Sequence, residues 1–336
     1  MLAMLNTRFF IALFLPAVMV FVVDVDFAPA QRRAAKTGTR KLAPGVMTTI
    51  PSEVQDDETF SGPREIVELS VGAPQLSWQP NLSAESETLL ARVKTTIFRR
   101  NIWALEFSFK PLSMIQVDLE QPDGTVKPQT VWYLVYNVRN NGKHLSPSPV
   151  PDESGRNTYA VEPVDHTIRF FPNFLLQCHD VDRVYLDKVM PTAVAAIRQR
   201  EDPNRKLYNS VSISDVNIPI SSELEDKSVW GVATWVNVDP RSDFFSIYVR
   251  GLTNAYQWQD PADGFKAGDS PGTGRRFLFK TLQLNFWRPG DAINPTESEF
   301  RFGVPNQSQV PAGKTEDDIL KLYGLKERVD YQWVYR

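Results

Sequence analysis

Two short stretches carry residue patterns of nucleophilic catalysis. Residues 268–272 read Gly-Asp-Ser-Pro-Gly, the G-x-S-x-G pattern in which a serine stands on a tight turn between a strand and a helix. Here the polar stretch 260–267 precedes the pattern and the strand-like Arg-Arg-Phe-Leu-Phe-Lys follows it. Pro271 also removes the backbone N–H that normally contributes to the oxyanion hole. The context therefore favours a loop over a nucleophile elbow.

The second stretch, Cys178-His179-Asp180, has the residue types of a thiol triad, in which a histidine activates a cysteine. Adjacent residues on a strand point to opposite faces, so the side chains of Cys178 and His179 are expected to diverge. Cys178 continues the alternation of Phe174 and Leu176, which predicts a small buried apolar residue. The triad is therefore the less favoured interpretation.

Carboxylates suggest two further chemistries. Asp180, Asp182 and Asp187 are close enough in sequence to hold calcium, but Tyr185 stands where an EF-hand loop starting at Asp180 needs glycine. We expect solvated turn acids here; a calcium site of another kind, or a metal site assisted by His179, is the alternative. Glycoside cleavage needs two acids about 5–10 Å apart. With 40 acidic residues, the sequence nominates no particular pair.

The best candidate contact surfaces follow two strand-like stretches, at 251–258 (GLTNAYQW) and 286–291 (FWRPGD). Both place aromatic rings beside amides or a guanidinium, as many sugar and peptide sites do. The structural alternative is that a tryptophan at a strand end covers the rim of a core. The candidate binding residues are Asn254, Tyr256, Trp258, Trp287 and Arg288.

The second of these stretches ends a strand predicted over 276–287. Its apolar residues share one face and its polar residues share the other, with Trp287 on the polar face. Pro289-Gly290 then suits the two central positions of a type II turn. Trp287 requires a second layer packed over it, a bulge that turns it inward, or a ligand.

Alternation of apolar and polar residues predicts that most of the chain is strand. The stretch 131–138 is apolar on both faces, which is typical of a central strand. Helices are predicted over 83–100, where apolar residues recur at helical spacing, over 190–201, where Pro191 fits the first turn, and over 315–324, where Thr315 is the N-cap and Gly324 the stop.

These elements predict a mainly β fold with a few helices: two β-sandwich-like, immunoglobulin-like units joined by a helical segment. The first β-rich domain, with the early helix, is expected at 66–187, the helical connector at 188–203, and the second β-rich domain, with the late helix, at 204–336. Two similar blocks, at 130–138 and 228–238, leave open whether the two units arose by duplication.

The N-terminus has the features of a targeting signal. Arg8 precedes an apolar run at 9–23, and Ala28-Pro29-Ala30 supplies a cleavage pattern, so residues 1–30 are expected to be a signal peptide. The basic residues just beyond the run favour the alternatives of an uncleaved anchor at 9–23 or a cytoplasmic product. Residues 31–65 are polar and aperiodic and are expected to form a disordered tail or linker.

Composition limits the partners. The net charge of −3 gives no general basic field, so nucleic acid is not expected as a partner. The single cysteine rules out an intrachain disulfide and a cysteine-based zinc site. No cofactor is expected, the possible ligands are a glycan or a protein, and a membrane would be contacted only through an uncleaved signal segment.

Two resemblances bear on this interpretation. The stretch YLVYNVRNNG resembles the strand and turn of immunoglobulin-like bacterial surface modules, around 131–142. The stretches WGVATWVNVDPRSDFFSIYVRGLTNAYQW, LQLNFWRPGD and YQWVYR are similar to a family of uncharacterised secreted bacterial proteins. The second resemblance covers about a third of the chain and implies export, but no activity.

The sequence thus predicts an exported, non-catalytic binding or structural protein of the cell envelope or extracellular space. Whether the protein is an enzyme is left open, with catalysis the less favoured answer. One alternative is a secreted carbohydrate-active hydrolase that uses paired carboxylates. Another is a subunit of a larger envelope assembly, which would expose a large apolar face.

Overall fold

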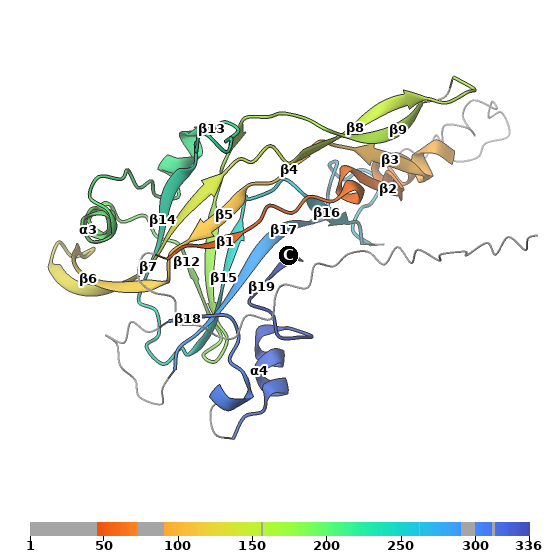
Figure 1. The fold of residues 1–336 in the computed structure, drawn as a ribbon. Coiled ribbons are helices and arrows are strands. Elements are labelled where there is room, and N and C mark those ends of the chain that lie inside the picture. The colour runs from red at the N-terminus through yellow and green to blue at the C-terminus, as the bar shows by residue number, and fades with distance from the viewer. Residues whose placement is uncertain (1–45, 73–90, 156, 262, 290–299, 311–312) are drawn as a thin grey trace, which may run out of the picture. The chain divides into compact units, whose positions relative to one another are not determined.

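The computed structural model describes residues 46–72, 91–155, 157–261, 263–289, 300–310 and 313–336 (Figure 1). These residues belong to one compact unit, 34–336. The predicted signal peptide at 1–30, residues 31–45 of the predicted tail, residues 83–90 of the predicted early helix and Gly290 of the predicted turn lie outside them. Within the described ranges, no helix is long and apolar enough to cross a membrane.

The first large sheet is antiparallel and is organised around one long strand that is buried on both faces, as its sequence predicts. The strand pairs along one edge with two strands that precede it and along the other with a strand from the second half of the chain. In order, the sheet is β1 (Thr48–Ile50), β5 (Glu106–Phe109), β7 (Val126–Arg139) and β14 (Val229–Val236), with β6 (Ser113–Glu120) also paired to β7.

The second large sheet also combines strands from the two predicted domains, 66–187 and 204–336, and its centre is the strand predicted over 276–287. Its order is β12 (Arg183–Leu186), β11 (Asn173–Cys178), β15 (Phe244–Arg250), β17 (Arg276–Trp287) and β16 (Tyr256–Gln259). Two further strands, β18 (Arg301–Phe302) and β19 (Tyr331–Tyr335), pair with β17.

Short elements complete the described chain. The small sheets are β2 (Phe60–Arg64) with β3 (Thr96–Arg99); β4 (Ile102–Trp103) with β8 (His144–Pro151) and β9 (Asn157–Pro163); and β10 (Ile168–Arg169) with β13 (Asn217–Ile218). The helices whose two ends are described are α1 (Val67–Ser70), α3 (Pro191–Glu201) and α4 (Glu316–Tyr323), and residues 91–94 are also helical. The 3₁₀ turns are η1 (Asp56–Thr59), η3 (Ser212–Asp215) and η4 (Gln307–Gln309).

The hairpin of β8 and β9 carries proline at alternate positions. Pro147, Pro149 and Pro151 are separated by one residue each along β8, and all three lie within its register with β9. Because backbone N–H groups on a strand point alternately to its two edges, these prolines remove donors from one edge only. The pairing with β9 persists, so the missing donors belong to the edge that faces away from β9, beyond His144 and Leu145, where β4 pairs with β8.

Aromatic side chains fill the space between the two large sheets. Alternate residues of each strand point to the shared core, where Phe109 packs edge-on against Phe286, with ring centroids 6.0 Å apart, and Trp132 against Phe245, at 5.4 Å. Each pair joins a strand of the first sheet to a strand of the second. The mainly β prediction is confirmed, and its core is shared between the halves of the chain.

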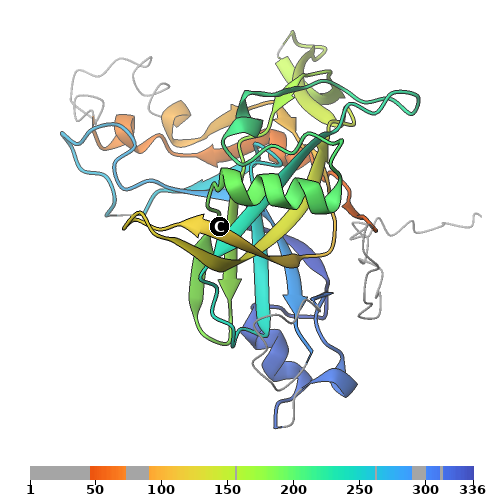
Figure 2. The same ribbon diagram turned by 90° about the vertical axis from the view of Figure 1, so that its left-hand side faces the viewer.

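The expected division into two sandwich units joined at 188–203 is not confirmed. Strand β7, from the predicted first domain, pairs with β14, from the predicted second domain, and β11 pairs with β15 in the same way. The helix predicted at 190–201 is present as α3, but it lies on the outer face of the first sheet (Figure 2). There it buries Ala193 and Ile197. Alternation identifies strands, whereas it does not identify which strand lies beside which.

The predicted tail is wrong where the structure describes it, from 46 to 65. Strand β1 pairs with β5, and Ile50 in β1 is 1% exposed. Farther along, Glu58 in η1 is also buried. The segment is too polar to form a hydrophobic core alone, but it adds an edge strand to a sheet that already has such a core.

The predicted early helix is wrong at its C-terminal end. Residues 91–94 are helical, but Thr96–Arg99 form strand β3, which pairs with β2. Thr96, Ile97 and Phe98 are β-branched or aromatic, and such residues favour strands where a partner is present.

The late helix is confirmed: Thr315 caps α4 by accepting from the Asp318 N–H, and Gly324 ends it at φ 70°.

The outer face of β17 is buried under a second layer, one of the three explanations that Trp287 required. Trp287 is 3% exposed and packs with Ile319 and Tyr323 of α4. The polar residues on the same face bond to each other: Gln283 Nε2 donates to Asn285 Oδ1 at 2.9 Å. The layer includes His179 Nε2, which lies 2.8 Å from Ser246 Oγ, a donor to Asn285 Oδ1.

This burial makes stability sensitive to acid. Burial, and to a lesser extent the charge of Arg336, lowers the pKa of His179 from 6.5 to about 4. Above pH 6.5 the imidazole is neutral in both the folded and unfolded states. Between pH 6.5 and 4 only the unfolded chain binds the proton, so the free energy of unfolding falls, by at most about 1.4 kcal/mol per pH unit from this group.

Denaturant unfolding of the protein and of His179→Gln between pH 7 and 4 measures this effect. The variant should lose stability less steeply than the protein does. Equal slopes for the two would contradict a neutral, buried His179.

Candidate functional site

A polar cavity of about 350 Å³ lies where the N-terminal segment meets the edge of β16. Its walls come from η1 and the residue before it, from β2, from Arg100, from β16 and from β19, which are far apart in the sequence. We call it the polar pocket. It is lined by Gln55, Asp57, Glu58, Phe60, Ser61, Gly62, Arg64, Arg100, Tyr256, Gln257 and Tyr335.

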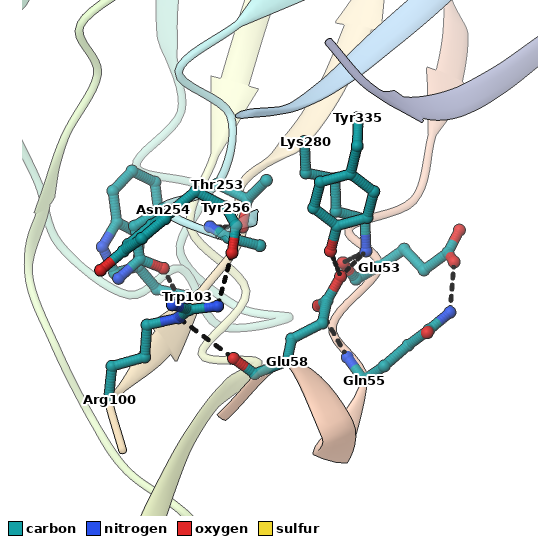
Figure 3. Close-up of polar contacts among 11 residues, drawn as sticks. Glu53, Gln55, Glu58, Arg100, Trp103, Thr253, Asn254, Tyr256, Lys280 and Tyr335 are labelled. Atoms are coloured by element: carbon teal, nitrogen blue, oxygen red, sulfur yellow. Dashed lines mark hydrogen bonds and ion pairs between the residues drawn. The ribbon is translucent and has the colours of Figure 1, made fainter. Parts of the chain in front are cut away.

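Two arginines of the pocket are held by the edge of β16. Arg100 donates from Nη2 to the carbonyl of Tyr256 at 2.6 Å and lies over the Tyr256 ring, 4.0 Å from its centroid (Figure 3). Arg64 repeats the arrangement two residues along, donating from Nη1 to the carbonyl of Trp258 at 2.7 Å and lying 5.0 Å from its ring centroid. Edge carbonyls of β16 thus fix the position of both guanidiniums.

A buried ion pair fixes the opposite wall. Lys280 Nζ donates to Glu58 Oε1 at 2.6 Å, and the side chains are 3% and 4% exposed. Tyr335 Oη donates to the same oxygen at 2.7 Å, and the Gln55 N–H donates to the other carboxylate oxygen (Figure 3). Burial, and then this bond to Glu58, raises the pKa of Tyr335. The contacts attach η1 to β17 and β19.

Three of the five predicted binding residues lie around the polar pocket, but only Tyr256 lines it. Asn254 has a structural role, because its side chain accepts from the Trp103 N–H and donates to the Asn101 carbonyl. The Trp258 side chain is 6% exposed and packs edge-on against Phe98.

The other two predicted residues lie elsewhere. Trp287 is enclosed by α4, and the guanidinium of Arg301 lies 5.0 Å from its ring centroid. Arg288 lines a different cavity of about 280 Å³ beside Trp132 and donates to the Pro240 carbonyl at 3.2 Å. The structure therefore does not unite the five residues in one site.

The two stretches with residue patterns of nucleophilic catalysis, 178–180 and 268–272, have the structures that their sequence contexts predict. Cys178 is fully buried in the core, and burial raises the pKa of its thiol to about 12. His179 contacts Ser246 on the outer face, so the two side chains diverge. Ser270 is exposed in a run of turns before β17, and its carbonyl accepts from the Thr273 hydroxyl.

The three aspartates weighed as metal ligands serve different contacts. Asp180 accepts from the backbone N–H of Asp243 at 2.6 Å, and Asp187 accepts from that of Thr234 at 2.7 Å and from the Ser210 hydroxyl. Asp182 adopts a positive φ of 46°. Across the described ranges, no group of three or more His, Cys, Asp or Glu side chains is placed to hold a metal ion.

Most residues of the polar pocket were not predicted as site residues from the sequence. Glu58 and Arg64 fall in the segment predicted to be a tail, and Arg100 in the segment predicted to end a helix. A local signal was present in Gln55 to Thr59, where Gln55 and Glu58 form a reciprocal capping pair. That pattern predicts a turn, but it does not identify Lys280 as a partner.

Comparison with known proteins identified no relative: no protein-family model, curated protein or solved structure matches the chain.

Replacing Lys280 by methionine should lower the free energy of unfolding by about 3–5 kcal/mol, because it leaves the Glu58 carboxylate buried without its cation. The matched control is Lys227→Met, which breaks an exposed pair with Glu225 at 3.0 Å and should cost about 0–1 kcal/mol. Denaturant unfolding of both variants provides the measurement. Similar small losses for the two would show that the buried pair does not anchor η1.

Proposed function

We propose that the chain is an exported, non-catalytic binding protein that holds a polar ligand, a glycan or a segment of polypeptide, in the polar pocket. The observation that carries the proposal is the pocket itself, a concavity of about 350 Å³ walled by hydrogen-bonding side chains. Its volume falls at the lower end of the range of roughly 300–1,000 Å³ that is common for small-molecule sites.

The chemistry of the walls supports a polar ligand. Ser61 and Gln257 offer a hydroxyl and an amide that both donate and accept, as the hydroxyls of a sugar or the amides of a peptide require. Gln55 also lines the pocket and uses one of its two amide N–H groups on Glu53 Oε1, at 3.0 Å. Tyr256 adds an aromatic side chain to this wall, the combination that favours sugars and peptides in many sites. A mainly apolar ligand would leave these groups without hydrogen-bond partners, at a cost in affinity.

Binding is favoured over hydrolysis because of how the pocket carboxylates are used. A glycosidase needs two acids placed about 5–10 Å apart across the scissile bond, with one free to donate a proton. Of the two acids that line the pocket, Glu58 already accepts from Lys280, Tyr335 and the Gln55 N–H. A glycosidase mechanism would have to release Glu58 from these bonds.

Export is supported by the sequence of the N-terminus. The apolar run at 9–23 and the Ala28-Pro29-Ala30 pattern are typical of a cleaved signal peptide. The alternatives are retention through 9–23 and incorporation into a larger envelope assembly.

Cleavage of the leader should give a mature chain that begins at Gln31 outside the cytoplasm. Cell fractionation followed by N-terminal sequencing tests this. An intact chain recovered from the cytoplasm would overturn the proposed location.

The ligand proposal is tested by screening the purified protein against neutral and acidic oligosaccharides and short peptides, then measuring the affinity of any hit by calorimetry. Gln257→Ala, which removes a hydrogen-bonding group from the pocket wall, should weaken binding roughly tenfold, about 1.4 kcal/mol. Gln259→Ala is the matched control, since Gln259 is exposed on the same strand outside the pocket. Equal affinities for the two variants would remove the pocket from the proposal.

A further inference from the structure

The two arginines of the polar pocket use few of their donors on the protein. With the described residues, Arg64 makes one hydrogen bond, to the Trp258 carbonyl, and Arg100 makes two, to the carbonyls of Glu58 and Tyr256. Each guanidinium has five N–H donors. In the part of the chain that the structure describes, neither forms an ion pair with a carboxylate.

Arg275 shows that the protein does neutralise a guanidinium where its role is structural. Arg275 also lies over the Trp258 ring, 5.6 Å from its centroid. Unlike Arg64, it pairs with Asp260 at 2.7 Å and with Glu68 at 3.1 Å. Two cations therefore stack on one ring. Arg275, outside the pocket, has carboxylate partners, whereas Arg64, which lines the pocket, has none among the residues that the structure describes.

The spacing of the pair follows from β16. The carbonyls that hold Arg100 and Arg64 belong to residues 256 and 258, so they repeat at two residues along an extended strand, about 7 Å. Both arginines line one cavity of about 350 Å³. A single planar anion between them can accept hydrogen bonds from both forks, the geometry that makes arginine the preferred partner of carboxylates.

The remaining charges leave the pocket with excess positive charge. Glu58 is neutralised by Lys280, with which it forms a contact of 2.6 Å. Among the described residues that line the pocket, the two guanidiniums then face one further carboxylate, that of the exposed Asp57. Two positive charges against one negative charge favour an anionic ligand over a neutral or cationic one.

Building on the proposed function, we propose that Arg64 and Arg100 bind a carboxylate group of the ligand in the polar pocket. That group has two possible sources, an acidic sugar or the C-terminus of a polypeptide, and both present the same planar anion. Gln55, Ser61 and Gln257 then contact the polar remainder of the ligand. Asp57 opposes binding and limits affinity.

The test uses two matched pairs of probes, measured by calorimetry with the full-length protein at low and moderate salt. One pair is a glucuronate disaccharide and its neutral glucose counterpart. The other is an acetylated tripeptide with a free C-terminal carboxylate and its C-terminal amide. In at least one pair the carboxylate probe should bind at least tenfold more tightly than its neutral counterpart, and that pair identifies the source.

Three variants test whether Arg64 and Arg100 cause the preference for the carboxylate probe. Arg64→Gln and Arg100→Gln should each reduce affinity for the carboxylate probe about tenfold or more and leave the neutral probe within twofold. Arg99→Gln is the matched control, because Arg99 stacks 3.6 Å from the Tyr159 ring centroid outside the pocket. It should leave both affinities unchanged.

Asp57→Asn provides a second test of the carboxylate site if an arginine substitution disturbs the edge of β16. Asp57 is exposed, so the substitution should leave folding intact, and removing its charge should tighten binding of the carboxylate probe severalfold. Neutral probes that bind as tightly as acidic ones, with no effect of the arginine variants, would overturn the carboxylate proposal and leave the proposed binding function standing. Failure of all four probes to bind would overturn the carboxylate proposal, and failure of the whole ligand screen would remove the binding function as well.

Discussion

Burial of β17 on both faces is the constraint on which the rest of the structure depends. The strand pairs with four others, and one face contributes Phe286 to the aromatic core between the large sheets. The opposite face is closed by α4, so its polar side chains have lost solvent and must satisfy each other. Gln283 and Asn285 do so through a network that reaches Ser246 and His179. The polar face of β17 therefore lies in the interior of the protein.

The same strand also creates the pocket. Lys280 lies near its N-terminal end, where burial obliges the ammonium group to find an anion, and Glu58 supplies one from more than 200 residues away in the sequence. That contact brings the polar N-terminal segment onto the sheet and places Arg64 beside the edge of β16. The carbonyls of β16 then orient Arg64 and Arg100. The pocket therefore forms only after the long-range pairing has formed.

Local sequence patterns predicted the strands and helix ends that depend on neighbouring residues. The run at 131–138, apolar on both faces, predicted a central strand, and the alternation over 276–287 predicted a strand. Thr315 and Gly324 predicted the ends of α4. Each of these features depends on near neighbours in the sequence. Strand partners, the layer over Trp287 and the pairing of Lys280 with Glu58 depend on distant segments and leave no local periodicity. Of the site, alternation and aromatic composition predicted Tyr256 alone, since its neighbours come from segments that are polar in sequence.

The prolines of β8 have a consequence for how the molecule behaves among its own copies. An edge that lacks N–H groups at Pro147, Pro149 and Pro151 cannot complete a ladder with an approaching strand, whatever the sequence of that strand. Intermolecular β-addition, the first step toward fibrous aggregates, is thus discouraged along this edge of the hairpin. The proline pattern acts as protection built into the backbone, independent of surface charge and therefore of salt.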